Sequence, residues 1–350
     1  MSTNTEAEIL TETCGPVMQV TLNRPGALNA LSHNMIQALA VGLTAWGNDR
    51  AIQAVIIRGA GGRAFCAGGD IKSTWANRET VALNDHYFYD EYRLNRQLFH
   101  YPKPLIALMD GVTMGGGYGV AGPCRFRVAT ENTKWAMPET GIGFFPDIGS
   151  SHSLQQAPGA MGMCVALTGM TLGPEDTLYA GFATHYIYAE ALPEIVAAIE
   201  ARGDPLTVIE QFHRSPAMIG PLCQHQDVID RCFSLDSVAA IVAALKQESS
   251  DWAAATLALL LSRSPLAVAV TFARMSRAQG QSFDQIIEDD YVIARHFMRG
   301  GEFFEGVRAM LIDKDKTPRW MPETLEKVTE AALSSHFAPL PGCLDDVFKV

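Results

Sequence analysis

The sequence predicts an α/β layered fold over residues 1–200, followed by an α-helical C-terminal region over 201–350. Two observations support this prediction. Short apolar runs such as "AVIIRG" (54–59) are typical of buried strands, and they recur with glycine-rich turns and helical segments after them. Beyond about residue 190, the apolar residues recur at helical spacing instead. We therefore expect one layered core that carries the chemistry and a set of helices that cover it.

The first part of the chain predicts two rounds of strand, turn and helix. Residues 17–22 alternate like a half-buried strand, and a helix with Ser32 as its N-cap follows. After the buried strand at 54–59 comes a helical segment over 77–100. In the second round we expect a strand before the triple glycine and a short helix after it. Two further strands are then expected at "FRVAT" and "KWAMPE".

The last part of the chain contains a series of helical segments. Ser264-Pro265 and Ser282 are typical helix starts. The segments are "LPEIVAAIEA", "SVAAIVAALKQ", "DWAAATLALLLS", "SPLAVAVTFARMSRA", "SFDQIIEDDYVIARHFM" and "FFEGVRAMLID".

Composition and charge exclude several classes of protein. The 27 basic and 38 acidic residues give a net charge of −11, which argues against an extended nucleic-acid surface. The seven cysteines contain no C-x-x-C pair, which predicts a reducing compartment. The histidines contain no H-E-x-x-H motif, so we expect no metal. The N-terminus lacks signal or transit character, and the longest apolar run (252–261) is about half of a membrane span. We expect a cytoplasmic chain or an already trimmed mature form.

Two glycine-rich turns are candidates for ligand contact. They are "AFCAGGDIK" (64–72) and "DGVTMGGGYG" (110–119), each after a predicted strand. Small residues let a ligand approach the backbone, and two such turns could give one substrate oxygen two N–H donors. Either turn alone is a weak signal, because glycines often serve only tight turns. Neither matches a P-loop, and the dinucleotide-binding pattern is poorly supported.

The stretch "MPETGIGFFPDIG" (137–149) places Glu139 and Asp147 in an apolar, glycine-rich run. An ionised carboxylate is costly there unless it is paired or used. One interpretation is a catalytic pair. The other is structural, with Glu139 in the first turn of a helix and Asp147 as the N-cap of the next. The spacing alone does not decide between them.

Two nucleophile hypotheses are weaker. Ser150 and Ser151 stand beside His152, but adjacent residues do not readily face each other and no G-x-S-x-G elbow is present. A role at the start of a helix explains the serines better. Cys66 lies beside a glycine turn without an evident cationic partner, so we expect it to serve packing.

On these residues the chain resembles the enoyl-CoA hydratase/isomerase (crotonase) superfamily, and within it the 3-hydroxyisobutyryl-CoA hydrolase branch. The resemblance covers most of 15–325 and implies a spiral of ββα units, with later helices that carry subunit contacts in relatives. It implies an acyl-CoA substrate, no cofactor, since CoA is part of the substrate, and a homo-oligomer formed through the C-terminal helices. The matching segments are "TLNRPGALNALS", "AFCAGGDIK", "KPLIALMDGVTMGGGYG", "MPETGIGFFPDIG" and "MRGGEFFEGVRAMLIDKDKTPRW".

The resemblance also implies roles for particular residues. The amides of Ala67 and Gly116 would form an oxyanion hole for the thioester carbonyl. Substrate would contact Glu91, Gly115, Gly116 and Gly119. Residues that would line the path of CoA come from two segments, and they are Arg24, Ala27, Leu28, Ala67, Gly69, Asp70, Ile71 and Lys72.

The implied reaction is thioester hydrolysis in valine breakdown. Hydratases carry one catalytic glutamate at the position of Gly119 and another at that of Glu139, so losing the first disfavours addition of water to a double bond. Glu139 would act as general base or as nucleophile, while Asp147 and Glu91 would hold a 3-hydroxyl group. The alternatives are an enoyl-CoA hydratase/isomerase and a non-catalytic binding protein. After Asp147 the chain departs from the branch with "IGSSHSLQQAPG", which bears on the acyl preference.

Overall fold

The structure is a computed structural model that describes residues 7–340, so Cys343 lies outside the described part. The chain divides into two compact units, and each takes three separate segments. Unit 1 comprises Met1–Gly69, Leu94–Trp135 and Leu172–Met218. Unit 2 comprises Asp70–Arg93, Ala136–Thr171 and Ile219–Val350. The boundary near residue 200 remains a prediction from composition.

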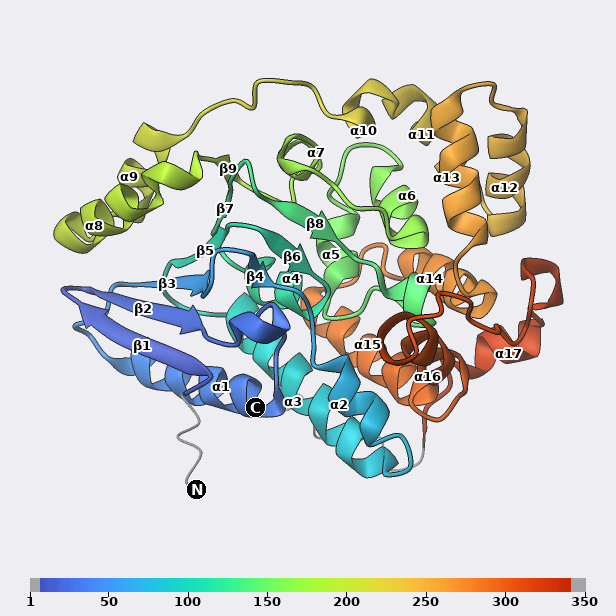
Figure 1. The fold of residues 1–350 in the computed structure, drawn as a ribbon, viewed down its shortest axis with the longest axis horizontal. Coiled ribbons are helices and arrows are strands. Elements are labelled where there is room, and N and C mark those ends of the chain that lie inside the picture. The colour runs from blue at the N-terminus through green and yellow to red at the C-terminus, as the bar shows by residue number, and fades with distance from the viewer. Residues whose placement is uncertain (1–6, 341–350) are drawn as a thin grey trace. The chain divides into compact units, whose positions relative to one another are not determined.

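A six-stranded sheet forms the centre of unit 1 (Figure 1). Its order is β1-β2-β3-β5-β7-β9, with β1 antiparallel to β2 and every later pair parallel. Strand β2 is almost wholly buried rather than half-buried as predicted, because it lies between β1 and β3 and apolar layers cover it. The strands are β1 (Ile9–Cys14), β2 (Val17–Leu22), β3 (Ala54–Gly59), β5 (Leu105–Met109), β7 (Phe126–Ala129) and β9 (His185–Tyr186).

A three-stranded sheet alternates with the large one along the chain. It contains β4 (Ala64–Cys66), β6 (Val112–Met114) and β8 (Lys134–Ala136). Strands β3, β5 and β7 of the large sheet are each followed by one strand of this small sheet, and helices follow each pair. This alternation confirms the predicted spiral of ββα units. Strand β8 ends before the proline of "KWAMPE" and is shorter than predicted.

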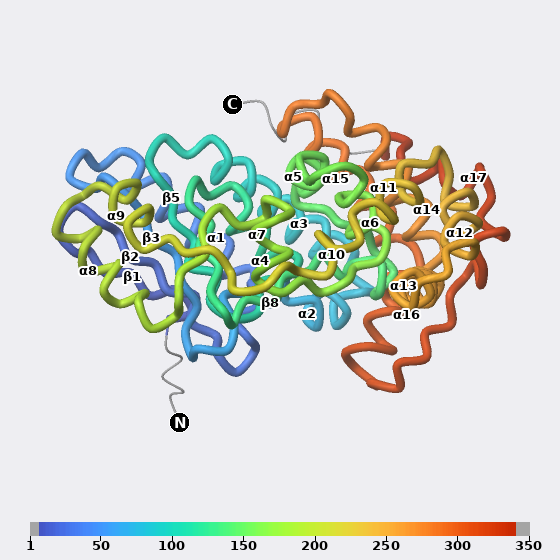
Figure 2. The backbone as a smooth tube through the Cα atoms, turned by 90° about the horizontal axis from the view of Figure 1, so that it is seen from above, coloured from blue at the N-terminus to red at the C-terminus, as the bar shows by residue number. Residues whose placement is uncertain are grey.

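Helices cover both faces of the large sheet. In Figure 1, α1 (His33–Asn48) lies below β1 and β2, whereas α8 (Leu192–Arg202) and α9 (Pro205–Phe212) lie above them. Figure 2, seen from above, shows α8 and α9 over the strands of this end of the sheet. Ile195, Ile199 and Val208 pack with strand residues such as Ile56 and Ile106 in one fully buried cluster. The expected N-cap is confirmed, because the Ser32 side chain accepts a hydrogen bond from the Met35 N–H.

The other helices of the chain follow the predicted segments with small shifts. The predicted helix over 77–100 is α3 (Val81–Phe99), and α2 (Ile71–Ala76) precedes it. Ser264 and Ser282 both cap helices as expected, and Ser282 forms a capping box with Gln285. The remaining α-helices are α4 (Gly116–Ala121), α5 (Ser150–Leu154), α6 (Met161–Thr168), α7 (Pro174–Tyr179), α10 (Pro221–Gln224), α11 (Gln226–Phe233), α12 (Val238–Gln247), α13 (Asp251–Leu261), α14 (Pro265–Arg277), α15 (Phe283–Phe297), α16 (Glu302–Val307) and α17 (Glu330–Ser335).

The apolar helices of the C-terminal half were also compared with the requirements of a membrane span. Within residues 7–340, no single helix is both long enough and apolar enough to cross a membrane. Helices α13 and α14 meet the length and composition test only when taken together, and a bend of 107° separates them.

The close packing of α4 against β4 in unit 1 depends on the second glycine of that helix. A Cβ atom added at Gly117 would lie 2.1 Å from the carbonyl oxygen of Cys66. We expect Gly117→Ala to lower the free energy of unfolding by about 1–3 kcal/mol, because the strand must move. Gly26→Ala is the control, since a Cβ there meets no atom within 4 Å. Chemical denaturation would contradict the packing argument if both variants unfolded at the same denaturant concentration.

Candidate active site

Three carboxylates from separate parts of the sequence gather inside unit 2. Glu91 lies on α3, Glu139 begins the 3₁₀ helix Glu139–Ile142, and Asp147 lies in the loop before α5. Their exposed fractions are 2%, 6% and 5%, and all three interact electrostatically. The structure thus brings together the three acids that the sequence singled out.

The structure changes the interpretation of Asp147. Helix α5 begins at Ser150, its N-cap is Gly149, and no side chain caps it. The structural interpretation of Asp147 as an N-cap is therefore excluded. Only its backbone carbonyl oxygen accepts a hydrogen bond at the start of the helix, from the Ser150 N–H at 2.9 Å. The side chain turns elsewhere, and its Oδ2 accepts a hydrogen bond of 2.5 Å from the buried Tyr92 hydroxyl.

Glu139 does occupy the first turn of a short helix, as its structural interpretation predicted. The same residue keeps an unused oxygen: among the described residues, no hydrogen-bond donor contacts its buried Oε2. A buried polar atom without a partner is costly and is uncommon outside functional sites. The two interpretations of Glu139 are thus compatible, because the helix fixes the direction of a carboxylate that remains available.

Burial and mutual repulsion raise the pKa values of these acids. Burial raises the pKa of Glu139 well above its ordinary value, and the charge of Asp147 adds to this effect. Burial raises the pKa of Asp147 to about 7, although the hydrogen bond from Tyr92 lowers it. Burial, and then Asp147, also raise the pKa of Glu91. Near neutral pH the cluster therefore shares protons instead of carrying three full charges.

The two glycine turns meet inside unit 1. A Cβ added at Gly68 would lie 3.5 Å from the Met114 carbonyl oxygen and 3.9 Å from the Gly116 nitrogen. Gly116 begins α4, and Gly115 before it has a φ of 48°, which glycine adopts without strain. Within the described part of the chain, the Gly116 N–H donates no recorded hydrogen bond. It is therefore available to a ligand oxygen.

Ala67 does not fit its predicted role as an oxyanion donor. Its N–H donates to the Leu28 carbonyl oxygen at 3.0 Å, which uses the only backbone donor of that residue. The prediction for Ala67 is therefore wrong. No such bond is recorded for the next two amides, Gly68 and Gly69, in residues 7–340. The sequence pattern located the turn, but it could not show which amide the neighbouring loop occupies.

The position of Gly119 is closed to a second catalytic acid. Gly119 lies buried in α4, and its carbonyl oxygen accepts a hydrogen bond of 3.1 Å from the Asn95 side chain. Gly115 and Gly116 are buried beside it. Its N–H donates to the Gly115 carbonyl oxygen at 3.1 Å, so both backbone groups are used and no side chain is present. Its contact with substrate stays a prediction.

The residues predicted to contact CoA lie on two separate segments. In unit 1, the Arg24 side chain pairs with Glu8 at 3.0 Å and donates to the Ala30 carbonyl oxygen at 2.6 Å, which holds the loop containing Ala27 and Leu28. Gly69 ends the first of the three segments of this unit. Asp70, Ile71 and Lys72 belong to unit 2, where the Asp70 side chain caps α2. Their contact with CoA remains a prediction.

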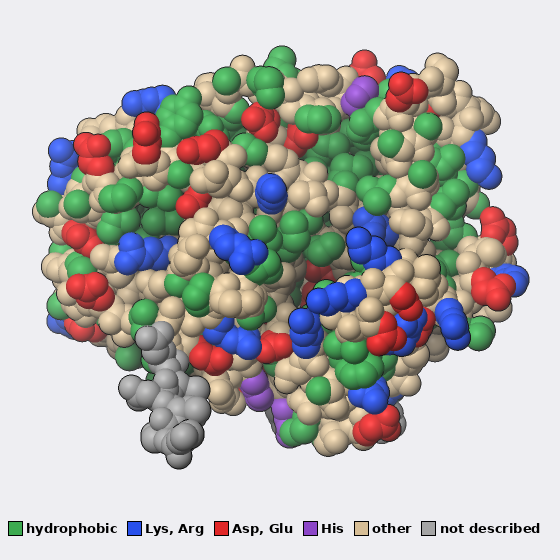
Figure 3. Space-filling view, in the orientation of Figure 1, with side chains coloured by type: hydrophobic (Ala, Val, Ile, Leu, Met, Phe, Trp, Pro, Cys, Tyr) green, Lys and Arg blue, Asp and Glu red, His purple; other side chains and the backbone are tan. Residues whose placement is uncertain are grey.

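Positive charge is available locally despite the net charge of −11. Figure 3 shows Lys and Arg side chains exposed on one face among Asp and Glu side chains. Lys72 is among the exposed residues. Anionic ligands can therefore meet local cations on this protein.

The alternative nucleophiles gain no support. The His152 ring packs edge-on against Phe283, with 5.8 Å between ring centres, and its Nδ1 lies 3.4 Å from the Gln156 side chain. The hydroxyls of Ser150 and Ser151 are buried without a recorded partner in the described residues. Cys66 is buried, with its sulfur 3.5 Å from the Gly68 carbonyl oxygen, as expected for packing.

Sequence reasoning missed Tyr92. It stands next to Glu91 on α3, but 55 residues separate it from Asp147, and a tyrosine in an aromatic helical segment carries no signal of its own. It also missed Arg274 and Asp290, whose contacts are described below.

Comparison with known proteins identifies the family of the chain. The sequence model of the family "Enoyl-CoA hydratase/isomerase" matches residues 17–337, so the chain belongs to the enoyl-CoA hydratase/isomerase family. Within it, the chain is similar to curated proteins named "3-hydroxyisobutyryl-CoA hydrolase, mitochondrial". It is 40% identical to that of Xenopus tropicalis (96% of this chain, 90% of the relative) and 39% identical to that of Homo sapiens (97% and 91%).

Two solved structures share the fold over nearly the whole chain. A carnitinyl-CoA dehydratase from Mycobacterium thermoresistibile has a TM-score of 0.92 and 38% identity, covering 96% of this chain and 98% of that one. An enoyl-CoA hydratase from Rhodobacter sphaeroides has a TM-score of 0.89 and 35% identity, covering 95% and 98%. These likenesses confirm the crotonase-like fold.

The hydrogen bond between Tyr92 and Asp147 yields a prediction about ionisation. Tyr92→Phe removes a donor that favours the ionised carboxylate, so we expect the pKa of Asp147 to rise above its value of about 7. Carboxyl ¹³C NMR of aspartate-labelled protein would measure this change. Tyr89→Phe on the same helix is the control. An unchanged or lower Asp147 pKa in Tyr92→Phe would contradict the assignment.

The same pKa predicts how stability depends on pH. The folded-state pKa of Asp147, about 7, exceeds the value of about 3.9 expected in the unfolded chain, so the folded state binds more protons between these values. The contribution of Asp147 to the free energy of unfolding therefore falls as the pH rises through 7. Asp147→Asn removes this titration, and we expect its stability relative to wild type to be higher at pH 8 than at pH 5. Parallel stability curves in urea would contradict this expectation.

Proposed function

We propose that the protein hydrolyses the thioester of a short 3-hydroxyacyl-CoA, with 3-hydroxyisobutyryl-CoA as the preferred substrate. One observation carries the proposal: Glu139 is buried with an unused oxygen beside Asp147 and Glu91, whereas Gly119 removes the second acid of a hydratase. The similarity to curated 3-hydroxyisobutyryl-CoA hydrolases over 96–97% of the chain supports it.

The thioester carbonyl oxygen would be held by backbone amides. Gly116 stays one donor as predicted from sequence, and one amide of the Gly68–Gly69 turn takes the place of Ala67. They stabilise the negative charge that develops on this oxygen during attack, and one such donor is worth roughly 3–4 kcal/mol of barrier. CoA enters as part of the substrate and leaves as a free product, so the reaction requires no cofactor.

Glu139 would supply the attacking oxygen in one of two ways. As a general base, it takes a proton from water while the water oxygen bonds to the thioester carbon. As a nucleophile, it bonds to that carbon itself, and water later cleaves the mixed anhydride. In both routes the carbon–sulfur bond breaks and the CoA thiolate is released to take up a proton. The raised pKa of Glu139 makes it a stronger base than an exposed glutamate.

Asp147 and Glu91 would recognise the 3-hydroxyl group. Both are buried and share protons, so they offer acceptors and donors to a hydroxyl group. Tyr92 holds Asp147 in place through the hydrogen bond to Oδ2. A site built to bond a hydroxyl discriminates strongly against acyl groups that lack one.

Hydration or dehydration is the second candidate function, because the two solved structures are named a dehydratase and a hydratase. Their reaction class needs two positioned groups at the double bond. The buried Gly119 supplies none, which favours hydrolysis. A non-catalytic binding protein would not require the buried acids.

Compartment and assembly are separate parts of the proposal. The curated relatives are named as mitochondrial proteins, so the comparison does not support the predicted cytoplasmic location. The cysteine pattern predicts a reducing compartment, and this part is retained. Assembly into a homo-oligomer through the C-terminal helices also stays a prediction.

The test is release of free thiol from 3-hydroxyisobutyryl-CoA. We expect wild type to release CoA, and Glu139→Gln to lower kcat at least about a hundredfold with little change in KM, because the amide cannot act as base or nucleophile. Glu305→Gln is a control at a partly exposed glutamate of α16. Near-normal kcat in Glu139→Gln would remove Glu139 from the chemistry.

A second readout separates hydrolysis from hydration. Wild type is incubated with crotonyl-CoA, and the absorbance of its conjugated double bond is followed. We expect this absorbance to persist. Its rapid loss, without thiol release from the 3-hydroxyacyl ester, would replace hydrolysis with hydration as the function.

A further inference from the structure

A second buried acid holds the loop that carries Asp147. Asp290 on α15 is completely buried, and its two oxygens are both used. Its Oδ1 accepts a hydrogen bond from Arg274 Nε at 2.7 Å, and its Oδ2 accepts one from the Gly149 N–H at 2.9 Å. Gly149 follows Asp147 by two residues. Asp290 thus links the candidate site to a cation that the proposed mechanism does not use.

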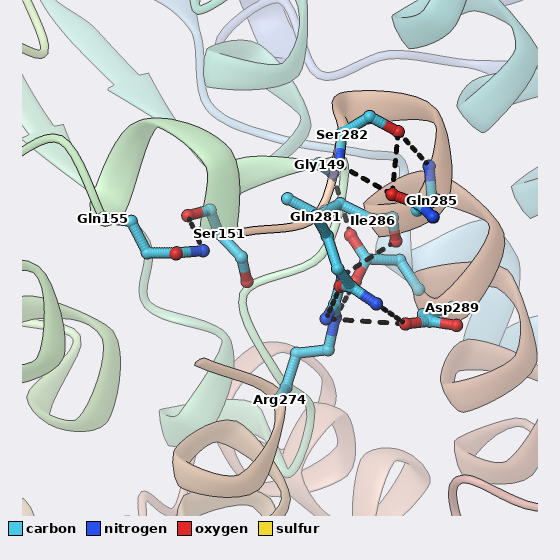
Figure 4. A network of polar contacts seen from close by, with 10 residues as sticks. Gly149, Ser151, Gln155, Arg274, Gln281, Ser282, Gln285, Ile286 and Asp289 are labelled. Carbon is cyan, nitrogen blue, oxygen red and sulfur yellow. Dashed lines mark hydrogen bonds and ion pairs between the residues drawn. The ribbon is translucent and has the colours of Figure 1, made fainter. Parts of the chain in front are cut away.

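Arg274 is fixed from several directions (Figure 4). It lies on α14 with 1% exposure, and its Nη1 and Nη2 donate to the Gln281 side chain and to the Ile286 carbonyl oxygen, both at 3.0 Å. Gln281 in turn donates to Asp289 at 2.9 Å. Burial raises the pKa of Asp290, and a guanidinium held in this way opposes that effect and keeps the carboxylate in one orientation.

The loop needs an anchor because its backbone is unusual. Ile148 has a φ of 58° and Gly149 a φ of 73°, and a left-handed conformation at a non-glycine residue costs roughly 1–3 kcal/mol. A Cβ added at Gly149 would lie 2.4 Å from the Phe283 ring of α15. The loop is therefore pressed against α15, and the bond from Gly149 N–H to Asp290 holds the strained conformation.

Successive residues of α15 support both ends of this loop. Asp290 binds Gly149, while the Tyr291 ring packs edge-on against Tyr92, with 6.2 Å between ring centres. Tyr92 is the residue that donates to Asp147. Displacing this turn of α15 would thus move the Asp147 carboxylate through two independent contacts.

The charged groups around Asp147 also connect it to Asp290. The groups that face it are Tyr92 and Glu91 from α3, Glu139 from the 3₁₀ helix and Asp290 from α15, with Arg274 and Asp289 behind Asp290. Burial is the main cause of the raised pKa of Asp147, and the charge of Asp290 adds to it. Arg274 partly offsets that charge, because it pairs with Asp290 directly.

We propose that Asp290, oriented by Arg274, is a positioning residue of the reaction: it holds the Asp147 loop through the Gly149 N–H and places a second negative charge beside the acid cluster. This inference rests on the proposed function, in which Asp147 binds the substrate hydroxyl. Asp290 acts only through Asp147 and does not touch the reacting atoms.

The test is Asp290→Asn in the full chain, with Asp289→Asn as the matched control. Both variants remove one negative charge at neighbouring positions of α15, but only Asp290 contacts the loop. For Asp290→Asn we expect kcat with 3-hydroxyisobutyryl-CoA to fall about tenfold, the loss for one charge-assisted hydrogen bond. We also expect the rising limb of the pH–rate profile to move to lower pH by at least about half a unit, because a nearby negative charge is gone. Asp289→Asn should match wild type in both measurements.

A double variant tests whether a low kcat results from loss of the fold. Asp290→Asn leaves Arg274 buried without its charge partner, whereas Asp290→Asn with Arg274→Gln removes both charges together. We expect the double variant to melt near wild type, to keep the low kcat and to show a smaller shift of the pH profile. Wild-type kcat and pH profile in either folded variant would overturn the proposal.

A measurement independent of turnover separates this inference from the proposed function. Amide hydrogen exchange at Gly149 should be at least about tenfold faster in Asp290→Asn than in wild type or Asp289→Asn, because its acceptor is weakened. If wild type does not hydrolyse the ester but Gly149 loses protection, the proposed function fails while the anchor stands. If wild type hydrolyses the ester and Gly149 exchange and the pH profile are both unchanged in Asp290→Asn, the inference alone fails.

Discussion

The burial of Glu91, Glu139 and Asp147 in one unit is the constraint on which the candidate site depends. Three acids removed from water cannot all be ionised, so they share protons and their pKa values rise. The surrounding structure must then hold each side chain in a fixed direction, because the acids repel one another. Tyr92 and the turn of α15 around Asp290 supply this support for Asp147. Reactivity and local instability therefore have the same physical cause.

Glycine serves two different purposes around this chemistry. At Gly117 the absence of a side chain allows β4 and α4 to approach closely, and the Gly116 amide beside it remains available in the same unit. At Gly149 the glycine allows a left-handed turn against Phe283. The first use exposes backbone donors to a ligand oxygen. The second use orients the Asp147 carboxylate. Both uses are consistent with chemistry on a carbonyl group.

Much of the fold and part of the site could be predicted from local patterns. Strand β3 and the caps at Ser264 and Ser282 match their predictions, because short apolar runs and capping side chains act within a few residues. Glu139 and Asp147 were recognised because carboxylates are conspicuous in apolar stretches. The error at Ala67 and the exclusion of Asp147 as an N-cap share one cause: in each, a group distant in sequence had already taken the hydrogen bond. Leu28 is that group for Ala67, and Tyr92 is that group for Asp147.

By itself, the sequence determined that the chain is an α/β layered fold with later helices, that two glycine turns follow buried strands, and that Glu139 and Asp147 belong to one apolar stretch. These properties depend on residues close together along the chain. Only the tertiary structure decided which amides remain unbonded, that Tyr92 donates to Asp147, and that Asp290 holds the loop of Asp147. Such contacts join residues from about 40 to 141 positions apart, and local patterns carry no information about which distant donor meets which acceptor.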